Sequence, residues 1–315
     1  MFIQPSKLKD YGIMGMNQRN LDFIGRYNDR SKYPLVDNKL KTKRLSEEHG
    51  VNVPKLLAVV ERQHEISQVV DNLKQLSRFA IKPAKGSGGK GIWVISGRTE
   101  NGFVKTSGAE VSFKDFERHL SNILAGLYSL SGTPDVAIIE TLIEFDDVFM
   151  GLSYQGVPDI RLIVFQGYPV MAMLRCATQA SDGKANLHQG AVGIGLDMAK
   201  GTSLRAMQNG RPISEHPDTG ANLLTIEIPN WREFLLLAAH CYEMTGLGYI
   251  GADLVLDKNQ GALLLELNAR PGLAIQIANK SGLLPRLKMV ESIAKKHRSP
   301  QERVAIAMDE FGSMT

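Results

Sequence analysis

The stretch GADLVLDKNQGALLLELNARPG places two acids and an amide between apolar runs: Asp253, Glu266 and Asn268. Carboxylate and amide oxygens are ligands that Mg²⁺ prefers, whereas transition metals favour His or Cys. The leucine-rich second run indicates a buried strand, where an unpaired carboxylate is costly. The residue types therefore predict a magnesium site. The alternative is an exposed edge hairpin whose acids face water.

The spacing of these residues supports the same prediction. Glu266 and Asn268 are two residues apart, so on a strand they share one face. If a turn at DKNQG pairs Leu256 with Leu263, Asp253 lies opposite Glu266, about 5 Å away at Cβ. Two carboxylates at that separation repel each other unless a cation lies between them.

A second stretch, IKPAKGSGGKGI, suits the binding of phosphate groups. It places Lys82 at the end of an expected strand, ahead of glycines at positions 86, 88, 89 and 91. Glycines let backbone N–H groups approach phosphates, and the lysine adds positive charge. The loop is not of the Walker A type, because Gly91 follows Lys90 where that motif has Ser or Thr, and a strand follows instead of a helix. A flexible hairpin tip is the alternative.

Charged residues also flank a later expected hairpin, at Asp159, Arg161 and Arg175. Asp159 and Arg161 share one face of a strand. On spacing alone, a surface ion pair is the favoured interpretation. No Ser-His-Asp or Cys-His arrangement is evident in the sequence, so covalent hydrolysis has little support.

Composition narrows the class of protein. The 315-residue chain carries a net charge of +4, and residues 1–100 hold 18 Lys and Arg against 10 Asp and Glu. A basic N-terminal third without dense basic patches and exposed aromatic residues favours a polyphosphate ligand over nucleic acid. The sequence shows no apolar run long enough to span a membrane and no secretory signal, so a cytoplasmic location is expected. Cys176 and Cys241 lie in apolar surroundings and are expected to be reduced, structural residues.

The elements expected to position these residues are mixed helices and hairpins, which indicates an α+β fold. Residues 186–201 are expected to form a glycine-studded excursion. The expected helices cover residues 38–50, 64–76, 112–127 and 231–246, with a helical tail from about residue 285, and the expected strands lie within 79–96, 135–143, 159–177 and 251–268.

Four motifs in order resemble the ATP-grasp superfamily, and within it the RimK-type α-L-glutamate ligases and their relatives. They are DNKLKTKRL with GVNVP, IKPAKGSGGKGI, ETLI followed by DIRLIV, and GADLVL with ELNARPGL. The resemblance implies an ATP-grasp fold of two α+β lobes that clamp ATP, with a shortened N-terminal segment. The implied parts are the N-terminal segment 1–36, the N-lobe 37–142, the C-lobe 143–285 and the helical tail 286–315.

The resemblance also implies which residues bind ATP. Lys39 and Lys82 contact phosphates, and a flexible loop folds over the β- and γ-phosphates. The strand that ends in Glu140 is the adenine hinge, and Asp159 takes the ribose hydroxyls. The remaining ATP-binding residues implied are Gly86, Ser87, Gly88 and Gly89 in the loop, Thr141 and Leu142 in the hinge, and Asn186.

The catalytic residues and metal ligands follow from the same resemblance. Two Mg²⁺ ions, with Mn²⁺ as an alternative, are held by Asp253, Asn268 and a bridging Glu266. RimK-type proteins have a basic residue shortly before the sequence NLH, and Lys184 corresponds to it here. For the oxyanion that forms during ligation, the available cations are Arg175 and Arg270.

The implied activity is an ATP-dependent carboxylate–amine ligase that works through an acylphosphate. It attaches glutamate or another amino acid to a peptide, protein or small acid. The alternatives are an ATP-grasp kinase, an ATP-grasp enzyme associated with cell-surface sugars, and a non-catalytic nucleotide-binding module. Residues 1–36 are too short for the domain that most ATP-grasp ligases carry there. Three alternatives are open: this segment lines the active site with Arg19 or Arg26, a second copy of the chain or a partner subunit supplies the missing surface, or the segment only caps the fold.

Overall fold

The computed structural model describes residues 8, 10–86, 88–129 and 132–313. Contacts divide the chain into two compact units. Unit 1 takes the described residues of Met1–Asp37, Leu45–Asn52 and Phe145–Thr315, and unit 2 takes those of Asn38–Arg44 and Val53–Glu144. The domain boundaries expected from the sequence stay a prediction.

Unit 2 is built on a six-stranded antiparallel sheet, in the strand order β1-β6-β2-β3-β4-β5 within the described residues. The expected strand–loop–strand arrangement around the glycine-rich stretch is confirmed, because β2 pairs with β3 on either side of it. The strands are β1 (Leu56–Val60), β2 (Phe79–Pro83), β3 (Trp93–Arg98), β4 (Gly102–Lys105), β5 (Glu110–Ser112) and β6 (Ala137–Thr141).

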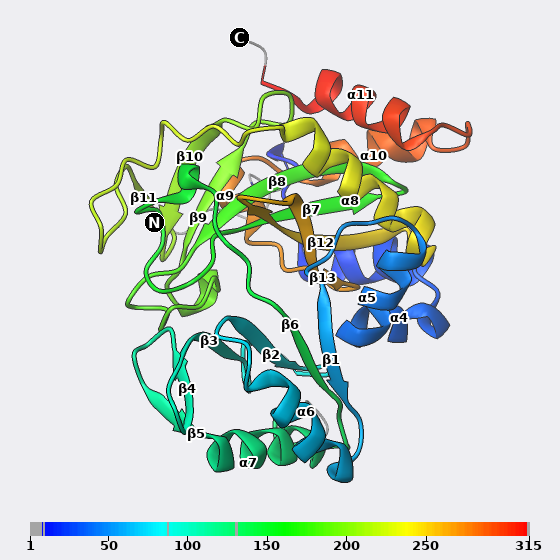
Figure 1. Ribbon diagram of the computed structural model, residues 1–315. Coiled ribbons are helices and arrows are strands. Elements are labelled where there is room, and N and C mark those ends of the chain that lie inside the picture. Colours follow the sequence, from blue (N-terminus) through cyan, green and yellow to red (C-terminus); the bar gives the residue numbers. More distant parts are fainter. Residues whose placement is uncertain (1–7, 9, 87, 130–131, 314–315) are drawn as a thin grey trace. The chain divides into compact units, whose positions relative to one another are not determined.

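Helices α6 (Ile66–Leu73) and α7 (Phe113–Leu124) pack against each other and against this sheet (Figure 1). The short helix η3 (Gln63–Glu65) precedes α6. The Ser112 hydroxyl accepts a hydrogen bond from the Asp115 amide and so caps α7. Phe116, Leu120 and Ile123 recur at helical spacing and are completely buried.

Aromatic rings fill the centre of this core. Phe79 on β2, Phe103 on β4 and Phe116 on α7 are all fully buried. Their ring centroids lie 5.1 Å apart for Phe79–Phe103, 5.9 Å for Phe79–Phe116 and 4.9 Å for Phe103–Phe116. These are contact distances for edge-to-face and tilted aromatic pairs, so the cluster ties the helices to the sheet.

Unit 1 is built on a seven-stranded antiparallel sheet, in the order β11-β10-β9-β8-β7-β12-β13 within the described residues. The hairpin expected over residues 159–177 is confirmed, with its turn at Gln166 and Gly167. The strands are β7 (Asp159–Phe165), β8 (Tyr168–Cys176), β9 (Val192–Leu196), β10 (Ser203–Gln208), β11 (Arg211–Ile213), β12 (Tyr249–Asp257) and β13 (Gly261–Asn268).

The glycine-studded excursion expected over residues 186–201 is wrong, because this segment contains the buried strand β9 between β8 and β10. Its glycines have a packing role. A Cβ on Gly193 would lie 2.6 Å from the Leu187 side chain, and one on Gly195 would lie 2.6 Å from the Ala278 carbonyl oxygen. Glycine therefore lets the helix that contains Ala278 approach the strand closely.

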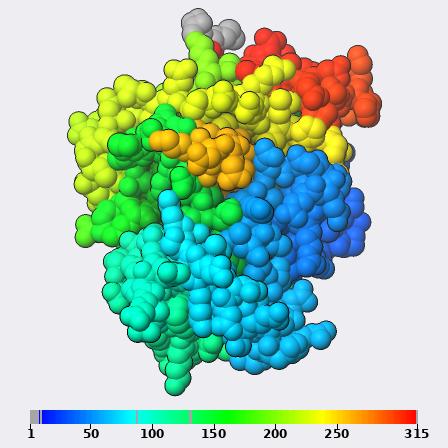
Figure 2. Space-filling model, viewed as in Figure 1, coloured from blue at the N-terminus to red at the C-terminus, as the bar shows by residue number. Residues whose placement is uncertain are grey.

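The helices of unit 1 include α8 (Trp231–Thr245) and α11 (Pro300–Phe311), which pack on each other and on β8. The Lys32 ammonium donates to the Gly246 carbonyl at the end of α8, at 3.3 Å, and Figure 2 shows blue N-terminal residues beside the yellow residues of α8. The other helices are α2 (Met16–Gln18), the π-helix η1 (Arg19–Ile24), α3 (Gly25–Tyr27), η2 (Arg30–Lys32), α4 (Pro34–Asp37), η4 (Asp147–Phe149), η5 (Leu187–Gln189), α9 (Ile275–Asn279) and α10 (Leu284–Ile293).

Helix α5 (Lys39–Glu48) confirms the helix expected over residues 38–50, and its residues are shared between the two units. Among the helices of the described residues, none has both the length and the apolar character needed to cross a membrane.

The aromatic cluster of unit 2 leads to a stability prediction. Phe103→Ala removes a fully buried ring and should lower the free energy of unfolding by about 3–5 kcal/mol in urea titrations. Phe145→Ala is the matched control, since Phe145 is 42% exposed, and it should cost less than about 1 kcal/mol. Equal losses for the two variants would contradict the packing described for Phe103.

Candidate functional site

Four charged side chains in unit 1 form one continuous hydrogen-bonded chain across the sheet. Antiparallel pairing sets Asp159 on β7 opposite Arg175 on β8, and Arg161 on β7 opposite Asp253 on β12. Arg175 Nε and Nη2 donate to the two carboxylate oxygens of Asp159, at 2.5 and 2.6 Å. Arg161 Nε and Nη2 donate to the two oxygens of Asp253, at 2.7 and 2.5 Å. Arg175 Nη2 also donates to Asp253 Oδ2, at 2.9 Å, which joins the two pairs.

These four hydrogen-bonded side chains are buried, so the surface ion pair favoured from spacing alone is wrong. None of the four side chains is more than 15% exposed. Spacing along β7 could not show this, because the neighbouring strands β8 and β12 provide the burial. Two acids and two guanidinium groups balance in charge, which is the condition under which charges are tolerated inside a protein.

The predicted pairing of Asp253 with Glu266 is confirmed. The predicted pairing of Leu256 with Leu263 is wrong, because a β-bulge after Asp253 shifts the register and Leu256 faces Ala262 instead. A bulge inserts one extra residue into one strand, here Leu265, and alternation of residue types cannot reveal it.

The donor types of the predicted metal site fit Mg²⁺, which takes carboxylate and amide oxygens. Burial alone would raise the pKa of Asp253, but Arg161 and Arg175 lower it, so the carboxylate is ionised at neutral pH. Asp253 Oδ2 is crowded, since it accepts bonds from both guanidinium groups and, at 3.4 Å, from the Asn268 amide.

Asp253 Oδ1 has fewer described hydrogen bonds than Oδ2. Among the hydrogen bonds described, it accepts one bond, from Arg161 Nε. The side chain of Glu266 is half-buried on the facing strand. Within the described residues, no group of three or more His, Cys, Asp and Glu side chains could hold a metal ion, and the predicted set contains two carboxylates and one amide.

In unit 2, the predicted residues Lys82 and Glu140 lie together. Glu140 on β6 is 2% exposed and forms ion pairs with Lys82 on β2 and with Lys43 on α5. The Lys43 ammonium lies 3.0 Å from Glu140 and also donates to the Pro54 carbonyl.

Lys43 was not among the site residues predicted from the sequence. A usable signal was present, because Lys43 follows Lys39 by four residues and such residues share one face of a helix. The predicted adenine contact of Glu140 stays a prediction, since its carboxylate is engaged by two lysines in this structure.

One residue of the predicted hinge, Thr141, already forms hydrogen bonds within the protein. The Thr141 amide donates to the Lys55 carbonyl at 2.9 Å, and its hydroxyl accepts from the Lys55 amide at 3.1 Å. Leu142 follows the end of β6. The adenine contacts predicted for Thr141 and Leu142 stay predictions, and in this structure the Thr141 amide already has a partner.

The first glycine of the glycine-rich loop, Gly86, is held by two contacts. The Lys39 ammonium donates to the Gly86 carbonyl at 2.8 Å, and Gly86 forms a β-bridge with Ser129. Gly88 and Gly89 are exposed and adopt φ values of 62° and 74°. Ser87 lies outside the described residues.

Three predicted residues have no described contact with the four hydrogen-bonded charged side chains of unit 1. Lys184 pairs with the exposed Asp182 at 3.0 Å. The Asn186 side chain caps η5 by accepting from the His188 amide. The Arg270 guanidinium is exposed and lies 5.3 Å from the centre of the Tyr33 ring.

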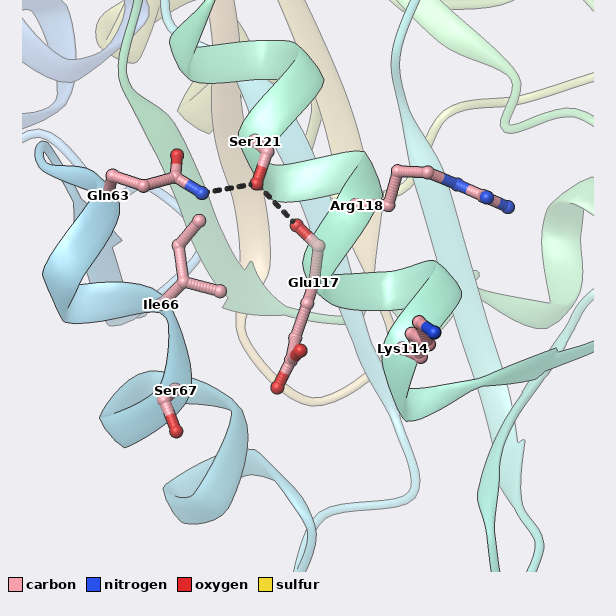
Figure 3. A pocket seen from close by; sticks show the side chains of 7 residues that line it. All are labelled: Gln63, Ile66, Ser67, Lys114, Glu117, Arg118 and Ser121. Atoms are coloured by element: carbon pink, nitrogen blue, oxygen red, sulfur yellow. Dashed lines mark hydrogen bonds between the residues drawn. The ribbon is translucent and has the colours of Figure 1, made fainter.

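A groove of about 380 Å³ lies elsewhere on unit 2, between α6 and α7 (Figure 3). Gln63 Nε2 donates to Ser121 Oγ at 2.7 Å across it, and Ser121 Oγ donates to the Glu117 carbonyl at 3.1 Å. None of the predicted site residues lines this groove.

Comparison with protein families matches residues 18–292 to the model for sugar-transfer associated ATP-grasp proteins. The chain belongs to this family. The ATP-grasp fold expected from the sequence is thereby confirmed, with its α+β character and its two antiparallel sheets. Assignment to the RimK-type subfamily stays a prediction. No curated protein matches the sequence.

Solved structures show a distant likeness. The ATP-grasp ligase PsnB with its minimal precursor is 13% identical, with 86% of this chain and 63% of PsnB covered and a TM-score of 0.41. The D-cycloserine synthetase DcsG is 14% identical, with 84% and 71% covered and a TM-score of 0.44. The D-alanine–D-alanine ligase from Coxiella burnetii is 12% identical, with 90% and 60% covered and a TM-score of 0.43. The chain spans less than two thirds of PsnB, and at these identities the likeness concerns the fold alone.

The buried position of Glu140 leads to a second prediction. Glu140→Gln leaves Lys43 and Lys82 without their anionic partner and should lower the free energy of unfolding by about 3 kcal/mol or more. The measurement is urea unfolding followed by circular dichroism.

The matched control is Glu144→Gln, in the same unit. Glu144 pairs with Arg78 at 2.9 Å, but the two side chains are 43% and 54% exposed. Such a pair is worth less than about 1 kcal/mol. If Glu140→Gln were no more costly than Glu144→Gln, the structural role assigned to the buried pair would be wrong.

Proposed function

We propose that the protein is an ATP- and Mg²⁺-dependent carboxylate–amine ligase that works through an acylphosphate. The observation that carries the proposal is the pairing of Asp253 with Glu266 on adjacent strands, with Asn268 two residues farther along β13. This pairing supports a magnesium site made of two acids and an amide, within an ATP-grasp fold.

Unit 2 contributes the groups that would hold the triphosphate. Lys82 and Lys39 supply positive charge, and the glycines of residues 86–91 allow close approach of backbone N–H groups to phosphate oxygens. The adenine would be held at the hinge by Leu142, and the ribose by Asp159. The role of Asp159 requires that its carboxylate accept hydroxyl protons in addition to the bonds from Arg175.

In the reaction, a substrate carboxylate attacks the γ-phosphate of ATP, and ADP leaves. An amine then attacks the acyl carbon and releases phosphate. Bound Mg²⁺, held by Asp253, Glu266 and Asn268, would neutralise charge on the phosphate oxygens. The chain's own cations would orient the reactants, with Lys184 close to the substrate.

For the oxyanion of the second step, Arg270 is better placed than Arg175. Arg270 is exposed, whereas Arg175 already donates to Asp159 and Asp253. A donor that is free to reach the developing charge is what such stabilisation requires.

The amino-acid substrate belongs to the proposal as well. Glutamate or another amino acid would be joined to a peptide, protein or small acid. The family description favours a second candidate, an ATP-grasp enzyme that acts in association with sugar transfer, for which the acceptor would carry a sugar. A kinase outcome would use the same nucleotide-binding residues.

The test is incubation with ATP, Mg²⁺, pooled amino acids and candidate acids, including acids that carry a sugar, followed by mass spectrometry. A ligase gives a product equal to acid plus amine minus water, together with ADP. A product heavier by one phosphoryl group would indicate a kinase, and the absence of both products in all pools would contradict the proposal.

A substitution tests the metal assignment in the same assay. Glu266→Gln should reduce turnover at least about 100-fold, because a neutral amide is a much weaker magnesium ligand. Glu310→Gln, at an exposed position of α11, is the control and should leave turnover unchanged. Normal turnover by a folded Glu266→Gln variant would remove Glu266 from the site.

A further inference from the structure

The glycine-rich loop of unit 2 is held at its C-terminal end as well as at its beginning. The Gly91 carbonyl lies 3.0 Å from Nε2 of His119 on α7. Gly91 has a φ of 75°, and a Cβ at this position would lie 2.5 Å from the Tyr128 ring. The tip at Gly88 and Gly89 is open by contrast, since a Cβ at either position would meet nothing within 4 Å.

His119 is itself fixed by its neighbours. It is 3% exposed, and its ring stacks on Trp93 with centroids 3.8 Å apart and planes 5° from parallel. The Lys105 ammonium lies 3.5 Å from the centre of the Trp93 ring. Lys105 and His119 therefore both contact the side chain of Trp93, the first residue of β3 and two residues beyond Gly91.

The surroundings of the His119 ring indicate its protonation state and its tautomer. Burial lowers its pKa to about 4, so the ring is neutral at pH 7 and carries one N–H. With the proton on Nε2, the ring donates to the Gly91 carbonyl. Nδ1 then accepts from the Tyr128 hydroxyl, 3.4 Å away. Both ring nitrogens are thus engaged, which leaves no free nitrogen for proton transfer or metal binding.

We propose that His119 is a positioning residue, which holds the C-terminal end of the glycine-rich loop through the Gly91 carbonyl. A buried ring N–H needs an acceptor, and for His119 that acceptor is the carbonyl at the end of the loop. Lys39 at Gly86 and His119 at Gly91 thus contact the two ends of the loop.

The anchor has a consequence for nucleotide binding, and this part rests on the proposed function. A loop that is ordered in advance loses less conformational entropy when it closes on phosphates. Loss of the anchor should therefore raise the Kd for ATP by about five-fold, the effect of one net hydrogen bond.

The test is hydrogen–deuterium exchange of the whole protein without nucleotide. His119→Leu removes the donor and should speed exchange of the amides of residues 88–91 by about five-fold. His119→Gln should restore exchange close to that of the wild type, because its amide nitrogen reproduces the position of Nε2.

The matched control is His216→Leu in unit 1. His216 is 1% exposed, and its Nε2 lies 3.0 Å from the Ala177 carbonyl, so it is a buried histidine bonded to a backbone carbonyl like His119. This variant should leave exchange at residues 88–91 unchanged. Exchange at these residues that is the same in His119→Leu and in the wild type, or equally fast in both leucine variants, would overturn the proposal.

A third variant keeps the test decisive if His119→Leu does not fold. His119→Asn retains an amide but is one methylene shorter than glutamine, so it should not reach Gly91, and exchange at residues 88–91 should be faster than in His119→Gln. Equal exchange in the asparagine and glutamine variants would overturn the anchor. Calorimetry with ATP is the separate arm: if the wild type binds no ATP, the proposed function fails, while the exchange data still decide the role of His119.

Discussion

Charge compensation in buried positions is the constraint on which both units depend. Each sheet carries charged side chains that are largely removed from water, and in each the opposite charges lie on neighbouring strands or on a packed helix. In unit 1, Asp159 and Asp253 are bound by Arg175 and Arg161. In unit 2, one carboxylate is bound by two lysines. Removal of one partner leaves a buried charge, which costs far more than an intact pair contributes.

The same charge compensation limits the negative charge that Asp253 would offer to a metal ion. Two guanidinium groups keep Asp253 ionised, but they also offset its negative charge and fill most of its acceptor sites. At the proposed site, a divalent cation would therefore depend on Glu266 and on phosphate oxygens for most of the remaining negative charge. This arrangement favours a site at which the metal and a polyphosphate bind together. Proteins usually bind Mg²⁺ through one or two carboxylates together with substrate phosphates.

Much of the fold could be predicted from the sequence because local periodicity specifies it. The hairpin of β7 and β8 followed from alternation and a short turn. The facing of Asp253 and Glu266 was predicted from a Leu256–Leu263 pairing that does not form, and the bulge is what produces it. The bulge at Leu265 could not be predicted, because it changes register without changing residue pattern. Strand β9 was hidden by glycines, whose small size serves packing against Ala278 and not a loop. The burial of Arg161 and the pairing of Lys43 depend on strands and helices distant in sequence, so spacing alone could not place them.

The central claim is that the acids and amide of β12 and β13 hold the magnesium through which ATP binds. It is tested most directly by isothermal titration calorimetry of the intact protein with ATP, once with excess Mg²⁺ and once with EDTA. The account predicts tight binding with Mg²⁺ and at least about a ten-fold weaker Kd with EDTA, because the carboxylates and the triphosphate then repel each other. Equal affinity under the two conditions would contradict it.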